Sequence, residues 1–196
     1  MAQRVGLLGG TFDPPHVGHL ILADQVRDQL DLHEVRLVVA NVPWQKVGAR
    51  VITDAGQRLE MVEAAVADAP GLVASRVELD LGGPSYTADT LDHLERLEPD
   101  VTWFVIVGSD AAAGLPSWHR ADELRRRARF AVADRPGTDR AELPAGWDLS
   151  FVEMPQIEVS STEIRALVAA GRSVRHLMPA AVVQRIERWG LYRLGP

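Results

Sequence analysis

Two histidines three residues apart follow a glycine-rich turn near the start of the chain. Residues 9–20 read GGTFDPPHVGHL, so an apolar run at 5–8 enters a double glycine, and His16 and His19 follow a Pro-Pro pair. Glycine lets the backbone approach a ligand closely, and the first amides of a helix have no partner within the helix. A strand that leads through such a turn into a helix N-terminus is typical of a phosphate site, with both imidazoles on one helical face. The segment therefore predicts a nucleotide phosphate site, although it has neither the lysine of a Walker loop nor the GxGxxG spacing.

The same two histidines could instead be a metal pair or ordinary surface residues. A zinc site needs further Cys, His or carboxylate ligands. The chain has no cysteine, and the remaining histidines, at 33, 93, 119 and 176, are scattered without ligand spacing. We therefore reject a structural zinc site and expect no set of metal ligands in the protein.

A second motif, rich in hydroxyl groups, lies in the C-terminal quarter, where the sequence reads VSSTEIR. Ser160 and Glu163 have the spacing of a capping box, in which the serine accepts a hydrogen bond from a free amide at the helix start. By itself this spacing predicts only a capped helix. Ser161, Thr162 and Arg165 add two hydroxyls and a guanidinium at the positive helix end, which is the chemistry of a phosphate contact. We therefore expect these three residues to bind phosphate, with Ser160 as the cap.

The only lysine of the chain, Lys46, and its only asparagine, Asn41, lie in the same short segment, NVPWQK. Arginine is abundant elsewhere, so codon bias toward G and C could explain why lysine and asparagine are rare. Alternatively, this loop needs a compact ammonium and a side-chain amide, neither of which arginine replaces well. The second explanation predicts that both residues contact substrate.

The composition excludes several classes of protein. A chain of 196 residues with a net charge of −6 can bury one substantial core, and it lacks the basic surface of a general nucleic-acid binder. No apolar stretch is long enough to span a bilayer, and residues 1–4 lead directly into an expected strand, not a signal peptide. The absence of cysteine excludes disulfides. We expect a cytoplasmic enzyme or binding protein that acts on neither nucleic acid nor membrane.

Apolar runs alternate with helical patterns along the chain. Runs rich in Val and Ile predict buried strands at 5–8, 35–40, 72–81, 101–107, 130–133 and 149–154. Helical stripes are formed by Leu20, Ile21, Ala23, Val26 and Leu30, by Leu59, Val62, Ala65 and Val66, and by Leu91, Leu94 and Leu97. The alternation predicts a single α/β domain over residues 1–196, a Rossmann-like doubly wound parallel sheet with helices on both faces. A C-terminal helical part, about 160–196, is expected to pack on it.

Candidate site segments follow three of the expected strands. These strands end in GGTF, NVPWQK and Gly108-Ser109-Asp110. Ligands of open parallel sheets bind beyond the carboxyl ends of the strands, near a switch in strand order. The three segments are therefore expected to meet at one edge of the sheet.

The HxGH element resembles the signature of the nucleotidyltransferase superfamily. The string GGTFDPPH resembles bacterial nicotinate-nucleotide adenylyltransferase when it is taken with YTADTL at 86–91, GSD and LPSW within 108–118, DRP at 134–136 and SSTEIR at 160–165. The resemblance extends over about 5–193. The chain departs from it at Trp44 and Gln45, where many members have a Pro-Pro-His-Lys type of sequence, and at Glu158-Val159, where a small apolar lead-in is usual.

The resemblance implies transfer of the adenylyl group of ATP to nicotinate mononucleotide, which gives deamido-NAD and pyrophosphate. Mg²⁺ would be held mainly by substrate phosphates and water, and the protein could form a homo-oligomer. Catalytic roles are implied for His16, His19, Lys46 and Arg165. Residues implied to bind ATP are Gly9, Gly10, Thr11, Phe12, His16, His19, Gly108, Asp110, Ser161, Thr162 and Arg165. Residues implied to bind nicotinate mononucleotide are Thr11, Asn41, Lys46, Tyr86, Thr87, Trp118 and Arg135.

Two other functions remain open at this point. A sister adenylyltransferase on the same fold, acting on nicotinamide mononucleotide or phosphopantetheine, would share the HxGH and SSTxxR-like elements. The Tyr86-Thr87-x-Asp89-Thr90 and Leu115–Trp118 segments favour nicotinate. A nucleotide-binding sensor without turnover is the other possibility, and the intact histidines, lysine and arginine argue against it.

Replacement of Lys46 tests whether the sole lysine contacts substrate. Lys46→Ala should lower kcat/KM, because a point charge that neutralises phosphate is lost. Lys46→Arg should also be impaired, since a planar fork on a longer stem cannot occupy the same position. Steady-state kinetics at subsaturating ATP and nicotinate mononucleotide measures both effects. If Lys46→Ala turns over like the parent, the lysine reflects codon bias alone.

Overall fold

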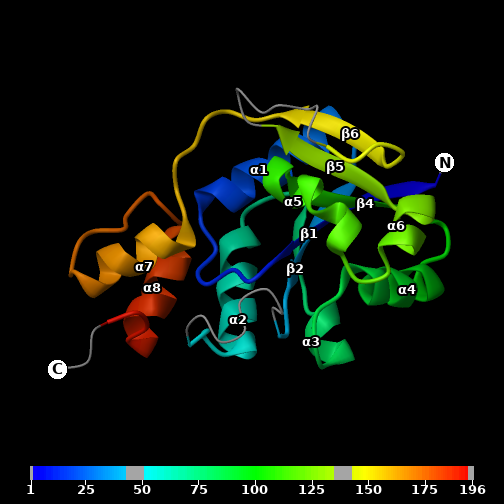
Figure 1. Ribbon diagram of the computed structural model, residues 1–196. Helices are drawn as coiled ribbons and strands as arrows, with labels where there is room; N and C mark the ends of the chain where they lie inside the picture. The colour runs from blue at the N-terminus through cyan, green and yellow to red at the C-terminus, as the bar shows by residue number, and fades with distance from the viewer. Residues whose placement is uncertain (1, 43–50, 135–142, 194–196) are drawn as a thin grey trace.

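A computed structural model describes residues 2–42, 51–134 and 143–193 of the chain, which form a parallel sheet between layers of helices (Figure 1). The six strands lie in the order β3-β2-β1-β4-β5-β6, and every neighbouring pair is parallel. The strands are β1 Gln3–Gly10, β2 Glu34–Val39, β3 Leu72–Ser75, β4 Val101–Gly108, β5 Arg129–Asp134 and β6 Asp148–Glu153. The helices are α1 Val17–Gln29, α2 Ala55–Val66, α3 Val77–Leu81, α4 Thr87–Leu97, α5 Ser109–Ala113, the 3-10 helix η2 Leu115–Ser117, α6 Ala121–Arg127, α7 Ser161–Ala169 and α8 Ala180–Trp189.

The strand order reverses direction between β1 and β4, which are neighbours in the sheet although the first half of the chain separates them. Their central residues are buried on both faces, as expected for strands covered by helices on either side. Crevices for ligands open at such a switch point, beyond the carboxyl ends of the strands. The expected doubly wound α/β fold is therefore confirmed, and the site segments follow the two strands at the switch.

The two faces of the sheet have separate hydrophobic clusters. On one face α1 and α2 bury Val26 and Val62 against Leu37 and Phe104 of the strands. The other face is covered by α4, α5 and α6, whose Leu91, Ala112 and Leu124 share a cluster with Val105 and Phe130. Both layers leave the carboxyl ends of β1 and β4 accessible.

A third hydrophobic cluster joins the C-terminal helices to α2. Met61 and Ala65 on the outer side of α2 pack against Ile164 of α7 and against Val182 and Ile186 of α8. Figure 1 shows α7 and α8 beside α2, reached by a long connection from β6 that passes over the end of the molecule. This packing brings the N-terminus of α7 to the loop that follows β1.

The expected strand at 72–81 is wrong over its second half. Strand β3 ends at Ser75, and Val77–Leu81 forms the short helix α3. Alternation of apolar and polar residues over so few positions does not separate a strand from a helical turn. The helix buries both Val77 and Glu78, and Glu78 accepts a hydrogen bond from the Thr90 hydroxyl (2.9 Å). Tertiary packing against α4 thus selects the helix.

The expected helical stripe of α4 is also wrong at its last member. Leu91 and Leu94 are buried in the core, but Leu97 is 65% exposed at the last turn of the helix. Leu97 is thus turned outward although the helix end is fixed to the sheet, where the carboxylate of the C-cap Glu98 pairs with Arg36 of β2. Across the described ranges, no helix is both long and apolar enough to cross a membrane.

Candidate nucleotide site

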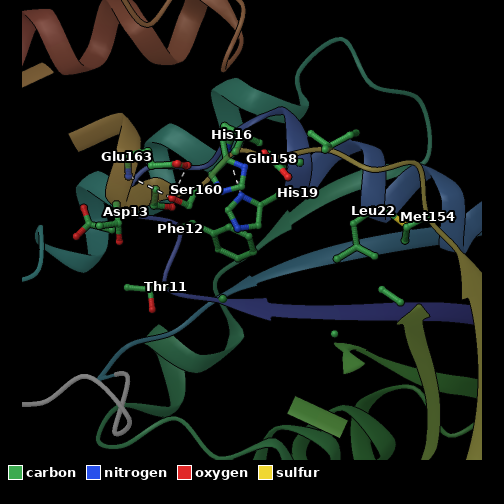
Figure 2. Close-up of a pocket in the computed structure, with 18 of the residues that line it drawn as sticks. Thr11, Phe12, Asp13, His16, His19, Leu22, Met154, Glu158, Ser160 and Glu163 are labelled. Carbon is green, nitrogen blue, oxygen red and sulfur yellow. Dashed lines mark hydrogen bonds between the residues drawn. The ribbon is translucent and has the colours of Figure 1, made fainter. Parts of the chain in front are cut away.

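A cavity of about 840 Å³ lies at the carboxyl ends of β1 and β4 (Figure 2). Its lining comes from the loop after β1, the first turn of α1, the segment 154–160 that follows β6, and the first turn of α7. Gly10 and Gly108 mark the strand ends at its base. Because two helix N-termini face the cavity, unpaired amides and the positive ends of two helix dipoles are directed at it.

Phe12 gives the loop after β1 an unusual backbone conformation. Its φ is 50°, a left-handed value that costs free energy for a non-glycine residue, and its side chain is only 2% exposed. The Phe12 ring lies against Gly10, where an added Cβ would come within 2.8 Å of it, and its edge meets the His19 ring at 4.9 Å between centroids. The second glycine of the motif is therefore required by this close approach.

Side chains from the C-terminal part of the chain hold the loop in this conformation. Arg165 of α7 donates to the Asp13 carbonyl (2.8 Å), and the Ser161 hydroxyl donates to the Pro14 carbonyl (2.8 Å). The Tyr192 hydroxyl donates to the buried Asp13 carboxylate (2.6 Å). Burial, together with this carboxylate, raises the pKa of Tyr192, so the phenol stays protonated and keeps donating.

The two imidazoles of the HxGH element stack on each other. The His16 and His19 rings are 3.8 Å apart between centroids and inclined by 29°, as Figure 2 shows with the Phe12 ring below them. His19 Nδ1 accepts the backbone N–H of His16 (3.2 Å). A nitrogen that accepts a hydrogen bond carries no proton, so the proton of His19 lies on Nε2. His19 is thus arranged to donate a hydrogen bond through Nε2.

Burial keeps the His16 imidazole uncharged at neutral pH. It is 7% exposed, and burial lowers its pKa from 6.5 to about 4, although the nearby Glu163 carboxylate acts in the opposite direction. Within the described part of the chain its Nδ1 has no hydrogen-bond partner. Gly18 packs closely beside it, because an added Cβ would lie 3.1 Å from His16 Nδ1 and from the Val159 side chain.

The start of α7 has the predicted cap. Ser160 Oγ accepts the Glu163 N–H (3.2 Å) and donates to the Glu163 carboxylate (2.9 Å). Arg165 also donates to the Thr162 hydroxyl (3.1 Å) while it holds the loop after β1. Hydroxyls, helix amides and a guanidinium therefore gather on one side of the cavity, a donor set that suits phosphate oxygens.

A second group of predicted residues lies outside this cavity, where β2 ends beside the start of α4. Asn41 donates from Nδ2 to the Gly83 carbonyl (3.0 Å), and its N–H donates to Ser85 Oγ (2.8 Å). Tyr86, the N-cap of α4, stacks on His119 at 4.4 Å between centroids. Below them, burial raises the pKa of Glu78, which the Ser85 and Thr90 hydroxyls oppose.

The remaining predicted residues are placed as follows. Trp118 is partly buried, with its ring edge-on to Phe130 at 6.2 Å, and Thr87 is the first residue of α4. Asp110 is exposed on α5, at the end of β4, and Gly9 lies in β1; both are outside the lining of the cavity. Lys46 and Arg135 lie outside the described residues. The predicted residues that line the cavity together are Gly10, Thr11, Phe12, His16, His19, Gly108, Ser161, Thr162 and Arg165.

Three residues beside the site were not assigned a role from the sequence. Asp13 lies inside the quoted motif, so its buried carboxylate could have been suspected. Arg58 shares a helical face with Met61 and Ala65, and a charged residue on an apolar face was a signal that could have revealed it. Tyr192 gives no signal in the sequence, because only the fold brings it to Asp13.

Comparisons with known proteins agree with this geometry. The profile of the cytidylyltransferase-like family matches residues 7–167, and the chain belongs to this family of nucleotidyltransferases. The solved structure of Plasmodium falciparum nicotinic acid mononucleotide adenylyltransferase complexed with NaAD superposes with a TM-score of 0.80, covering 97% of each chain at 18% sequence identity. This similarity shows a shared fold.

Sequence relatives place the chain more narrowly. It is 43% identical over 190 residues to the probable nicotinate-nucleotide adenylyltransferase of Exiguobacterium sibiricum, covering 97% of this chain and 99% of the relative. It is 44% identical over 193 residues to the protein of the same name from Saccharopolyspora erythraea, covering 97% and 90%. The chain is therefore a member of the nicotinate-nucleotide adenylyltransferases.

The lowered pKa of His16 predicts a pH dependence of stability. The unfolded chain binds a proton at about pH 6.5 that the folded protein binds only near pH 4, so this contribution to stability is present above pH 6.5 and is lost as the pH falls from 6.5 toward 4. The free energy of unfolding, measured by urea denaturation at several pH values in this range, should change less steeply with pH for His16→Gln than for the parent. Parallel curves for the two proteins would show that His16 titrates normally in the fold.

Proposed function

We propose that this protein transfers the adenylyl group of ATP to nicotinate mononucleotide, giving deamido-NAD and pyrophosphate in NAD biosynthesis. The observation that carries the proposal is the meeting of the HxGH imidazoles with the N-terminus of α7 around one cavity at the sheet switch point. This cavity supplies donors for a polyphosphate, and the relatives at 43% and 44% identity bear the name of this activity.

The reaction asks the protein for positioning and charge stabilisation. A phosphate oxygen of the mononucleotide attacks the α-phosphorus of ATP in line, a new P–O bond forms, and the bond to the β-phosphate bridging oxygen breaks as pyrophosphate leaves. The attacking phosphate is already anionic, so no protein nucleophile or strong base is required. The protein must hold two polyanions together against their repulsion and stabilise the charge that develops.

The cavity residues have complementary roles toward ATP in this proposal. The backbone from Gly9 to Phe12 would hold the nucleotide, and His19 would donate its Nε2–H to the α- or β-phosphate. His16, whose pKa burial lowers, would gain a proton more readily beside phosphate, because a nearby anion raises the pKa of an imidazole. Arg165 and the amides at the start of α7 would receive the departing pyrophosphate.

The acceptor would bind on the side of the site where β2 ends and α4 begins. Asn41, Tyr86 and Thr87 lie together there, and Trp118 would stack on the pyridine ring. Thr11, which lines the cavity, would also contact the mononucleotide. Lys46 and Arg135 are proposed to reach substrate phosphates from segments outside the described residues. Asp110 would contact nucleotide hydroxyls from the end of β4.

Mg²⁺ fits this site as a companion of the substrates. The carboxylates of Asp13, Glu158 and Glu163 line the cavity, and Asp13 and Glu163 accept the Tyr192 and Ser160 hydroxyls, whereas the groups proposed to hold phosphate are hydrogen-bond donors. The cation would therefore be held by phosphate oxygens and water and would neutralise charge on the phosphates. A cytoplasmic location and a homo-oligomeric state stay predictions.

Loss of His19 should reduce turnover much more than stability. His19→Ala should lower kcat by about two to three orders of magnitude, the scale for losing a preorganised group that stabilises developing charge. His33→Ala is the matched control, because His33 Nδ1 also accepts a backbone N–H, that of Arg4 (3.1 Å), away from the cavity. Near-normal turnover of His19→Ala, with a melting shift like that of the control, would make the role of this histidine structural.

Pyrophosphate release with different acceptors tests the proposed function. With ATP and Mg²⁺, nicotinate mononucleotide should exceed nicotinamide mononucleotide in kcat/KM by at least about tenfold, which is roughly 1.4 kcal/mol. The reason is that donors near Thr87 meet a carboxylate in one substrate and a neutral amide in the other. Trp118→Ala should weaken the binding of the mononucleotide and have little effect on the binding of ATP.

Other outcomes of this assay identify the alternatives. A preference for nicotinamide mononucleotide or phosphopantetheine would indicate a sister adenylyltransferase. Nucleotide binding without pyrophosphate release with any acceptor would indicate a sensor. Equal kcat/KM for the two mononucleotides would contradict the nicotinate assignment and leave the fold untouched.

A further inference from the structure

A buried arginine connects the two halves of the candidate site. Arg58, in the first turn of α2, is only 1% exposed, and its guanidinium donates to three backbone carbonyls. Nη1 donates to Thr11 (2.8 Å), Nη2 to Asn41 (3.2 Å) and Nε to Thr53 (2.8 Å). Thr11 follows β1, and Asn41 follows β2. One side chain therefore joins the ends of two neighbouring strands at the edge where substrates are expected.

Burial of the Arg58 guanidinium costs free energy, which its three hydrogen bonds offset. Removing a charged group from water costs several kcal/mol unless hydrogen bonds replace its hydration. The planar fork of arginine presents donors in fixed directions, so it can reach three separate carbonyls at once. A lysine ammonium is compact and cannot span them in the same way. The requirement at this position is thus for shape as well as charge.

The contact with Thr11 orients the strained part of the loop after β1. The peptide between Thr11 and Phe12 is trans, so its C=O and N–H point in opposite directions. With the Thr11 carbonyl held by Arg58, the Phe12 N–H is directed away from α2. Both residues line the cavity, and Phe12 has the positive φ of 50°. Arg58 therefore sets the direction of a backbone amide in the segment proposed to hold ATP.

Through its contact with Asn41, Arg58 also positions the side of the site where nicotinate mononucleotide is proposed to bind. Asn41 is hydrogen-bonded to Gly83 and Ser85. When Arg58 holds the Asn41 carbonyl, it therefore also fixes the end of β2 relative to the segment that precedes α4. That segment leads into Tyr86, proposed to contact the mononucleotide. The Arg58 guanidinium thus continues the link between the two subsites beyond the last backbone hydrogen bond of the strand pair, from Ala40 to Gly10.

We propose that Arg58 is a positioning residue that sets the spacing between the ATP and mononucleotide subsites. The inference rests on the proposed function, since it concerns the alignment of the two substrates of that reaction. Arg58 acts through Thr11 and Asn41. Loss of the Arg58 guanidinium should therefore impair the alignment of the two substrates more than it weakens the binding of either substrate alone.

Arg58→Lys and Arg58→Met test this proposal, with Arg36→Lys as the matched control. Arg36 is another arginine held by two or more hydrogen bonds, but it is only partly buried and its partners are the Glu34 and Glu98 carboxylates. A misplacement on the order of 1 Å can cost about 100-fold in rate, so kcat of Arg58→Lys should fall by about 10- to 100-fold. Arg36→Lys should keep the parent's kcat and KM, measured well below the melting temperature of each protein.

Binding measured by calorimetry separates alignment from a general loss of structure. In Arg58→Lys the affinity for a non-hydrolysable ATP analogue and for nicotinate mononucleotide, each alone, should stay within about threefold of the parent. The affinity for deamido-NAD, which occupies both subsites at once, should fall by about tenfold or more. Unchanged kcat and unchanged deamido-NAD affinity in Arg58→Lys would overturn the proposal. So would normal values in Arg58→Lys with a loss only in Arg58→Met, because charge alone would then suffice.

The remaining outcomes are also decisive. A parent that releases no pyrophosphate with nicotinate mononucleotide would refute the proposed function, and the spacing role with it. An active parent with an unaffected Arg58→Lys would refute the spacing role alone. If neither Arg58 variant folds, nuclear magnetic resonance of the parent labelled at the guanidinium nitrogens decides. The Arg58 signals should shift when deamido-NAD binds, and unchanged signals would contradict the proposal.

Discussion

The conformation of the four residues that follow β1 is the constraint on which the candidate site depends. Phe12 has a left-handed backbone, and such strain persists only where the surroundings over-determine it. Here the surroundings are distant in sequence. Arg58 and Arg165 each hold a loop carbonyl, and Tyr192 holds the Asp13 carboxylate. The sheet, α2, α7 and the C-terminal segment must therefore all be in place before the loop can present its amides and the two imidazoles to a nucleotide.

This dependence explains why α2 has two apolar sides. One side covers the sheet through residues such as Val62, and the other receives α7 and α8 through Met61 and Ala65. Packing against α2 directs the N-terminus of α7 at the loop, where Ser161 donates to the Pro14 carbonyl. The hydrophobic cluster outside the sheet thus places the polar groups of the site. The cavity is lined by these donors, by the carboxylates of Asp13, Glu158 and Glu163, and by His16, whose pKa burial lowers to about 4.

Much of the fold and part of the site could be predicted because their signals are local. Buried strands such as 101–107 are nearly continuous apolar runs, and the HxGH and SSTEIR segments carry their own turn and cap chemistry. The errors arise where local signals are ambiguous. Residues 77–81 alternate over too short a stretch to separate helix from strand, and Leu97 continues the spacing of a helical stripe beyond the point where the helix contacts the core. In both cases burial depends on which element packs alongside.

The sequence by itself determined the alternation of strands and helices, the phosphate-binding chemistry of its two motifs and the family to which the chain belongs, because these depend on residue types at short spacing. Only the tertiary structure decided that Arg58 joins Thr11 to Asn41, that Tyr192 reaches Asp13, and that His16 is buried and neutral. Contacts between residues as far apart as 13 and 192 leave no periodic trace along the chain. They result from helices docking on a common core, and the pKa of a side chain follows from the burial that this docking produces.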